Sequence, residues 1–359
     1  MALARPGPPG QSAAMRATAI LTVKNEGAFL LEWLAHHRAC GFTHVLAFSN
    51  ACSDGTDAML DRLAQLGGLT HVRNDGPHDQ GPHWSALRLA EGHPALADAD
   101  WLAVLDVDEF VNIHAGDRTL AALVAALPQA DAIAMTWRMF GNCGVVSRND
   151  RPVLETFLRA APATLAWPWR AQQFKTLYRN DGSWRKPGIH RPRGAVAGRS
   201  PRWFDGSGRA VPDLARGSRS FSDYGRDNYG LVQLNHYALG SMQDYLLKCD
   251  RGRANREAAG FDMGYWIDRN FCAVEDRSIM ALDSTALRAD LMADPVLGAL
   301  HRQAENWRKA RFQTLMQDES QRALFGRLLM SGPTRVLDKD MAKLILSHAA
   351  RAETPMKQP

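Results

Sequence analysis

The sequence predicts an α/β protein in which a mostly parallel sheet is sandwiched by helices, with a helical appendage at the C-terminus. Two observations predict this class. Up to about residue 140, short apolar runs alternate with segments of helical periodicity through short connections, a pattern typical of a parallel sheet with right-handed crossovers. From residue 284 onward, apolar residues recur at helical spacing only.

In the first part of the chain, apolar and β-branched runs predict strands and 3.6-residue spacing predicts helices. Gly41 ends the first helix, and Asp54 begins the second with acidic residues in its first turn. The expected strands are 18–24, 44–49, 69–73, 101–106 and 132–138, and the expected helices are 27–39, 54–67, 83–90 and 119–127.

After residue 141 the pattern loosens. Residues 194–228 are rich in Gly, Arg, Ser, Pro and Asp, which predicts a long loop or flexible flap. The domains expected are a disordered leader (1–15), a sheet domain (16–280) and a helical extension (281–359). Further strands are expected at 174–178 and 231–234, and further helices at 241–248, 284–331 and 338–350.

Composition limits the class of protein. A chain of 359 residues with 45% hydrophobic residues can bury a sizeable core, and its net charge of +5 suits phosphate-bearing ligands. No nucleic-acid-binding motif is present, so no nucleic-acid partner is expected. The five cysteines are scattered without a C-x-x-C, which favours free thiols in a reducing compartment. No 18-residue apolar run is present, so a cytoplasmic location is expected, while peripheral membrane contact and oligomeric state stay open.

The most informative stretch is 101–111, where an apolar run leads directly into Asp106, Asp108 and Glu109. Such a run predicts a buried strand, and carboxylates are seldom buried unless paired or bound to a cation. On an extended backbone Asp106 and Asp108 would point the same way, an arrangement that suits a divalent ion holding phosphates. The alternative is a strand-end turn whose aspartates cap a neighbouring segment.

Polar motifs follow three of the predicted strands. Lys24-Asn25-Glu26, residues 50–54 and residues 106–108 all lie at carboxyl ends. Ligands of parallel α/β sheets bind beyond these ends, so we expect one site to include all three motifs.

These motifs, followed by Phe174-Lys175-Thr176, His190 and Leu234-Asn235-His236-Tyr237, resemble in their order the family 2-like glycosyltransferases. The most similar group is the bacterial branch related to glycosyltransferase family 92. The resemblance covers residues 18–260. It implies a GT-A fold and a hexosyltransferase of polysaccharide biosynthesis that uses a nucleotide-sugar donor (UDP-sugar favoured), a glycan or other hydroxyl acceptor, and Mn²⁺ or Mg²⁺.

The resemblance also implies roles for individual residues. Asp108 would coordinate the metal, Asp106 would contact the donor ribose or sugar or a metal-bound water, and His236 would complete the metal site. The other donor-binding residues implied are Lys24, Glu26 near the uridine, Asp54 near the base or ribose, and Lys175 and His190 as positive charge for the leaving diphosphate.

The catalytic base is left open by the sequence. An inverting enzyme, the mechanism expected here, needs a carboxylate to take the proton of the acceptor hydroxyl. No late Glu-Asp or Gln-x-x-Arg-Trp motif follows the central strand at the expected place, and Glu275-Asp276 comes late. Glu155 and Asp223 are the candidates.

Structural roles compete with each assignment: an N-cap for Asp54, a surface loop for His190, a packed histidine for His236 and a solvent-facing lysine for Lys175. Two other functions compete with this one. A metal-dependent nucleotidyltransferase would carry a Gly-rich loop after the first strand, where this chain has one glycine, Gly27. A non-catalytic carbohydrate-binding protein would have lost its acidic positions, and this chain keeps them.

Overall fold

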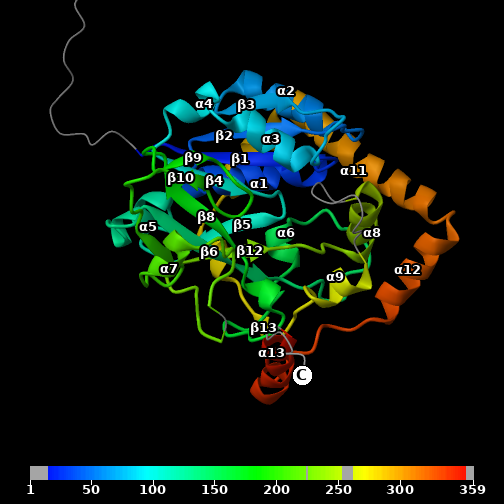
Figure 1. The fold of residues 1–359 in the computed structure, drawn as a ribbon. Coiled ribbons are helices and arrows are strands. Elements are labelled where there is room, and N and C mark those ends of the chain that lie inside the picture. The colour runs from blue at the N-terminus through cyan, green and yellow to red at the C-terminus, as the bar shows by residue number, and fades with distance from the viewer. Residues whose placement is uncertain (1–14, 224, 253–261, 353–359) are drawn as a thin grey trace, which may run out of the picture.

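The computed structural model describes residues 15–223, 225–252 and 262–352 (Figure 1). The leader predicted for residues 1–15 lies, except for Met15, outside the described residues. The predicted α/β class, with a mostly parallel sheet and C-terminal helices, is confirmed. Its helices are α1 (Gly27–Cys40), α2 (Thr56–Leu66), α3 (Pro82–Ala90), α4 (Pro94–Ala97), α5 (Leu120–Ala126), α6 (Val153–Thr156), α7 (Pro212–Arg216), α8 (Met242–Arg251), α9 (Met263–Ile267), α10 (Thr285–Ala293), α11 (Pro295–Leu315), α12 (Glu319–Met330) and α13 (Lys339–Ala352).

The central sheet has the strand order β3-β2-β1-β4-β8-β6-β12-β5, with β11 paired to β6. Strands β1 to β4 are mutually parallel, whereas β8 is antiparallel to both β4 and β6. The main strands are β1 (Ala17–Val23), β2 (His44–Ser49), β3 (Leu69–Arg73), β4 (Trp101–Leu105), β5 (Glu109–Ile113), β6 (Ala132–Met139), β8 (Phe174–Arg179), β11 (Trp203–Asp205) and β12 (Val232–His236). The shorter ones are β7 (Arg159–Ala160), β9 (Trp184–Lys186), β10 (Arg193–Ala195) and β13 (Val274–Glu275).

Alternation along β1 divides the core between the two faces of the sheet. Ala19 and Leu21 belong to the core shared with α1, α2 and α5, and Ile20 belongs to the opposite core, covered by α3 and α7. Since β8 runs against its neighbours, it begins at the edge where β4 ends. The antiparallel strand therefore brings Phe174 and Lys175 to the same edge as Asp106.

The loop predicted over residues 194–228 is wrong in its central part. This segment contains β11, which pairs in parallel with β6 in the main sheet, and the short helix α7. Trp203, Asp205 and Leu214 are buried there. A large aromatic and a leucine give this polar segment enough apolar surface to pack against the sheet.

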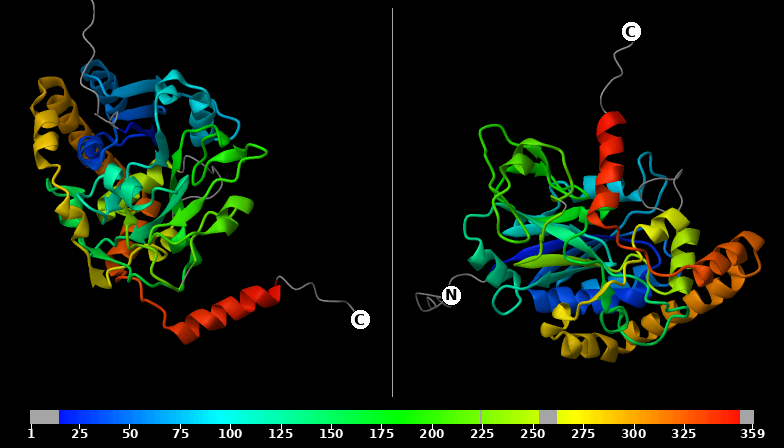
Figure 2. Two further views of the ribbon diagram at one scale, coloured as in Figure 1. Left: turned by 90° about the vertical axis from the view of Figure 1, so that its left-hand side faces the viewer. Right: turned by 90° about the horizontal axis from the view of Figure 1, so that it is seen from below.

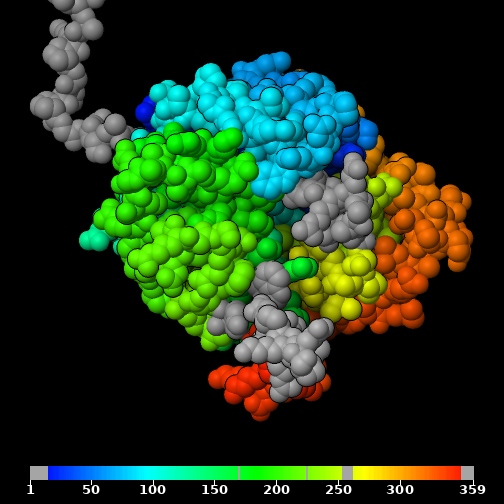
Figure 3. All heavy atoms as spheres, viewed as in Figure 1, coloured from blue at the N-terminus to red at the C-terminus, as the bar shows by residue number. Residues whose placement is uncertain are grey.

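The C-terminal helices extend the fold. Helices α10 and α11 pack against α1, and α11 also contacts α2 and α8. Figure 3 shows the yellow region around α8 and α9 between the orange C-terminal helices and the green half of the chain. Helix α13 projects from the body (Figure 2). No helix of the described segments combines the length and apolar character needed to cross a membrane.

Candidate active site

The Asp-x-Asp motif forms a tight turn between β4 and β5, in which the Glu109 backbone N–H donates to the Asp106 carbonyl at 3.0 Å. The expectation that both aspartates point the same way on an extended backbone is therefore wrong. Asp106 faces Lys175 of β8, whereas Asp108 faces His236 of β12 and Lys248 of α8. Because the chain turns between them, the two carboxylates face different basic side chains.

Asp106, Glu109 and Lys175 form what we call the inner cluster. Lys175 Nζ lies 2.9 Å from Asp106 Oδ2 and 3.4 Å from Glu109 Oε2, and the side chains of Lys175 and Glu109 are fully buried. Glu109 also accepts from Trp137 Nε1 at 2.6 Å and from the Asp106 backbone N–H at 2.8 Å. Lys175 therefore does not face solvent.

Within the inner cluster, Lys175 and Asp106 hold each other charged, whereas burial raises the pKa of Glu109 to about 8 and keeps it mostly protonated at neutral pH. Burial alone would lower the pKa of Lys175, but Asp106 and Glu109 raise it above its ordinary value. Burial would raise the pKa of Asp106, and the Lys175 ammonium holds it below its ordinary value. Asp106 is thus an ionised carboxylate of fixed orientation, with its side chain 36% exposed at the sheet edge.

Asp108, His236 and Lys248 form the outer cluster. Lys248 Nζ donates to Asp108 Oδ2 at 2.6 Å and to the Ala238 carbonyl at 2.7 Å. His236 Nε2 lies 3.7 Å from the same Asp108 oxygen, and its ring packs against Trp137 with centroids 4.4 Å apart. Burial would raise the pKa of Asp108, but Lys248 and His236 hold it well below its usual range.

The loop after β1 is tied to α8 as well. Arg251 forms an ion pair with Glu26 and donates to the Lys24 carbonyl at 2.9 Å. Asn25 lies in the same loop, where its Oδ1 accepts from the Ser53 backbone N–H at 2.7 Å. The structure thus places Lys24 and Glu26 at the edge that holds the outer cluster.

Asp54 has a structural environment. It is fully buried, and its carboxylate accepts from the Gly27 N–H at 3.0 Å and from the backbone and hydroxyl of Thr56 at 2.9 and 2.6 Å. These bonds join the β1–α1 loop to the start of α2. Because Asp54 is fully buried, a direct donor contact would require this segment to open, so the contact stays a prediction.

His190 lies close to the inner cluster. Its Nδ1 is 3.0 Å from the Phe174 carbonyl, and its ring centroid is 5.5 Å from that of Trp137. Burial, together with the nearby Lys175 charge, lowers the pKa of His190 to about 4. His190 is therefore neutral at neutral pH and does not supply the positive charge expected of it.

The two candidates for the catalytic base lie outside both clusters. Glu155, on α6, has a side chain 45% exposed and lies 3.9 Å from Arg151. Asp223 is paired with Arg219 at 2.9 Å and Arg226 at 2.8 Å. Within the described residues neither forms an ion pair with Lys175 or Lys248.

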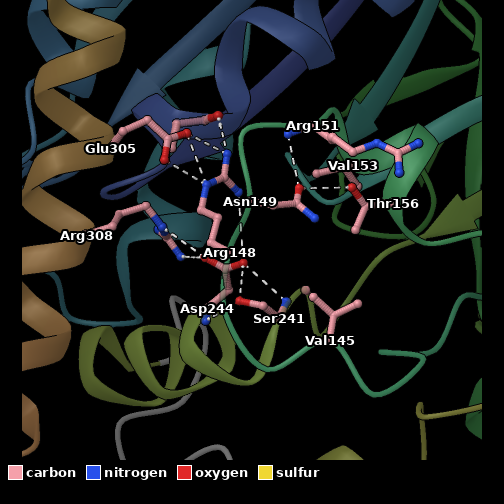
Figure 4. Close-up of polar contacts among 12 residues, drawn as sticks. Val145, Arg148, Asn149, Arg151, Val153, Thr156, Ser241, Asp244, Glu305 and Arg308 are labelled. Atoms are coloured by element: carbon pink, nitrogen blue, oxygen red, sulfur yellow. Dashed lines mark hydrogen bonds and ion pairs between the residues drawn. The ribbon is translucent and has the colours of Figure 1, made fainter.

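A polar network behind the outer cluster fixes α8 (Figure 4). Arg308 of α11 pairs with Asp244 of α8 at 2.8 Å, and Arg148 pairs with Glu305 of α11 at 2.7 Å. Both guanidinium groups also lie over the Phe29 ring, at 4.3 Å for Arg148 and 4.7 Å for Arg308. The C-terminal helix α11 therefore holds the helix that carries Lys248 and Arg251.

A small cavity of about 50 Å³ adjoins the outer cluster. Glu26, Asp108, Lys248 and Arg251 are among its lining residues. It has room for a few water molecules but not for a nucleotide sugar. The paired side chains fill the space next to Asp108 in this conformation.

Comparison with known proteins agrees with the geometry. Residues 22–181 match the model of glycosyltransferase family 92. The match covers somewhat less than half of the chain, which in this segment is similar to glycosyltransferase family 92. The matched segment includes the inner cluster and Asp108, while His236 and Lys248 lie beyond the matched residues.

Several solved structures resemble the chain at low identity. Residues 1–349 of Staphylococcus aureus TarS in complex with UDP are 16% identical, with a TM-score of 0.29, 46% of this chain covered and 47% of that one. A second TarS structure is 17% identical, with a TM-score of 0.28, and 46% of this chain and 28% of that one are covered. The chain thus spans less than half the length of the TarS chains it matches.

A putative glucose-1-phosphate thymidylyltransferase from Bacillus anthracis, in complex with a sucrose, is 11% identical, with a TM-score of 0.27, 45% of this chain covered and 71% of that one. No curated protein matches the chain.

Sequence reasoning missed Glu109 and the two α8 cations, Lys248 and Arg251. Glu109 carried a signal, since it is the third carboxylate of the Asp-x-Asp stretch. The sequence signal for Lys248 and Arg251 was weak: they lie three residues apart, which places them on one face of a helix. Lys248 lies 140 positions from Asp108 and Arg251 lies 225 positions from Glu26, so only the fold identifies their partners.

Proposed function

We propose that the family 92 domain transfers a hexosyl group from a UDP-sugar to a hydroxyl of a glycan or similar acceptor, with Mn²⁺ or Mg²⁺ bound at Asp108. One observation carries this proposal. Asp108 Oδ2 and His236 Nε2 lie 3.7 Å apart at the carboxyl edge of the sheet, with a cationic group already against the carboxylate.

The residues present fit a divalent ion shared with substrate. Among the described residues, no group of three or more His, Cys, Asp or Glu side chains forms a ready protein cage. Ions that hold phosphates need no such cage, since one or two protein ligands, waters and the phosphates complete the shell. Two ligands of one such ion are roughly 3–4 Å apart, given bonds of about 2 Å. Asp108 and His236 meet this requirement.

Each cluster has its own part in the chemistry. A divalent ion at Asp108 would neutralise charge that develops on the leaving diphosphate. Lys175 keeps Asp106 ionised and oriented, so that Asp106 can accept hydrogen bonds from the donor ribose or sugar. Lys24 and Glu26 would lie beside the uridine, on the loop that Arg251 fixes.

Glu155 and Asp223 remain the two carboxylates that we propose for deprotonation of the acceptor in an inverting reaction. The variants Glu155→Gln and Asp223→Asn distinguish them. Loss of the base should lower kcat by about 10²-fold or more, with nucleotide affinity unchanged. If both variants keep wild-type kcat, neither residue is the base.

Titration calorimetry of UDP with and without Mn²⁺ tests the donor site. We expect Mn²⁺ to raise UDP affinity in the wild type, and Asp108→Asn to remove this gain. Asp98→Asn is the matched control, because the Asp98 side chain is 87% exposed and its ion-pair partner, Arg16, lies 3.7 Å away. Equal Mn²⁺ dependence in wild type and Asp108→Asn would contradict the proposal.

A further inference from the structure

Lys248 has the contacts of a cation held in a small oxygen site. Its Nζ lies 2.6 Å from Asp108 Oδ2 and 2.7 Å from the Ala238 carbonyl oxygen. The ammonium thus takes up the Asp108 oxygen that faces His236 Nε2.

The helix that carries Lys248 is firmly positioned. A capping box between Ser241 and Asp244 begins α8, and Asp244 is paired with Arg308 of α11. The backbone of α8 is therefore fixed, and the mobile part of Lys248 is its four-carbon side chain. The ammonium can leave Asp108 without movement of the helix.

We propose that Lys248 is an internal counterion that competes with the divalent ion for Asp108 and, once displaced, pairs with the donor diphosphate. This inference rests on the proposed function. An ammonium and a divalent ion cannot share one carboxylate oxygen at contact distance, because like charges a few ångströms apart repel strongly in a partly buried site. Lysine is well suited to the second role as a point charge for phosphate.

The proposal links the binding of metal and nucleotide. Without nucleotide, the divalent ion must displace Lys248 from its carboxylate and carbonyl partners, which weakens metal binding. When a diphosphate is present, it receives the displaced ammonium and also ligates the metal. Mn²⁺ and UDP should therefore each raise the affinity of the other, and Lys248 should supply part of this coupling.

Removal of the ammonium tests the competition directly. We expect Lys248→Met to bind Mn²⁺ at least about fivefold more tightly than the wild type in the absence of nucleotide, measured as free Mn²⁺ by electron paramagnetic resonance. Lys248→Arg, which keeps the charge, should bind Mn²⁺ like the wild type. UDP should raise the Mn²⁺ affinity of Lys248→Met by a smaller factor than that of the wild type.

Two controls separate this inference from the proposed function. Lys186→Met removes a lysine whose side chain is 49% exposed and lies 3.1 Å from Glu91, and it should leave Mn²⁺ affinity unchanged. Asp108→Asn should weaken Mn²⁺ binding; if it does not, the metal site itself is misplaced. If Asp108→Asn weakens binding while Lys248→Met leaves Mn²⁺ affinity equal or lower, competition by Lys248 is overturned and the proposed function stands.

Discussion

The inner and outer clusters place similar chemical groups in different surroundings. Each pairs an aspartate of one turn with a lysine, Asp106 with Lys175 and Asp108 with Lys248. Lys175 is fully buried on a central strand and contacts both Asp106 and Glu109, whereas the Lys248 side chain is 12% exposed on a helix and contacts Asp108 and the Ala238 carbonyl. Burial and the position of the lysine, on a central strand or on a peripheral helix, therefore separate a fixed ion pair from an exchangeable one.

The difference assigns separate tasks to the two aspartates. The inner cluster is held by strand pairing on both sides of β8 and by Trp137, so it orients Asp106 and fixes the turn. The outer cluster rests on α8, which α11 fixes from behind. An exchangeable ion pair next to a fixed one allows the site to change its cation without a change of fold.

Loss of the inner lysine should have the largest effect. Lys175→Met leaves Asp106 and Glu109 without their shared cation, and removal of one partner from a buried ion pair costs about 3–5 kcal/mol. Urea unfolding at neutral pH measures the loss. The double variant Lys175→Met/Asp106→Asn should recover part of it, because the carboxylate left without its counterion is then removed. A loss below about 1 kcal/mol, the range of surface pairs, would show that the inner cluster does not stabilise the fold.

Acid should have the next largest effect on stability, through the histidines that lie against β5. His36 and His37 are buried beneath β5, and His36 Nε2 lies 2.8 Å from the Val111 carbonyl. Burial lowers the pKa of His36 to about 4, while the unfolded chain takes up its proton near pH 6.5. The stability this group contributes is complete above pH 6.5 and falls as the pH drops through about 4, by about 3 kcal/mol in total.

The matched variant for this pH effect is His36→Gln, whose amide can still donate to the Val111 carbonyl. Urea unfolding from pH 7 to pH 4 should show a shallower loss of stability in the variant than in the wild type. If the free energy of unfolding falls equally steeply with pH in both proteins, His36 does not contribute to the acid sensitivity of the fold.

Periodicity predicted most of the fold because strands and helices leave a local pattern. Two strands of the main sheet were missed. Strand β11 is three residues long and lies between polar segments, and β5 follows β4 after a three-residue turn, so neither has a separate local pattern. In the site, Asp106 and Asp108 could be predicted because they lie two residues apart, directly after an apolar run. The antiparallel direction of β8 and the approach of α8 depend on tertiary packing, and they decide which lysine meets which aspartate.

The network behind α8 should have an intermediate effect. Arg308→Met removes charged hydrogen bonds to Asp244 and should cost about 1.5–3 kcal/mol. Metal-dependent UDP affinity should fall with it, because α8 carries Lys248 and Arg251. The control on the same helix is Arg311→Met, an arginine 38% exposed and paired with Asp250 at 2.7 Å, which should cost less than about 1 kcal/mol. Equal losses in the two variants would remove the special role of Arg308.

The outer lysine should matter least for stability. Asp108 keeps a side chain 22% exposed to solvent and a neighbour in His236, so Lys248→Met leaves a carboxylate that water can still solvate. The expected loss is within about 1 kcal/mol in urea unfolding, near the range of partly exposed pairs. High salt should reduce the difference from the wild type further, because screening acts on accessible charges. A loss as large as that of Lys175→Met would make both clusters structural, and the distinction between a fixed and an exchangeable pair would then fail.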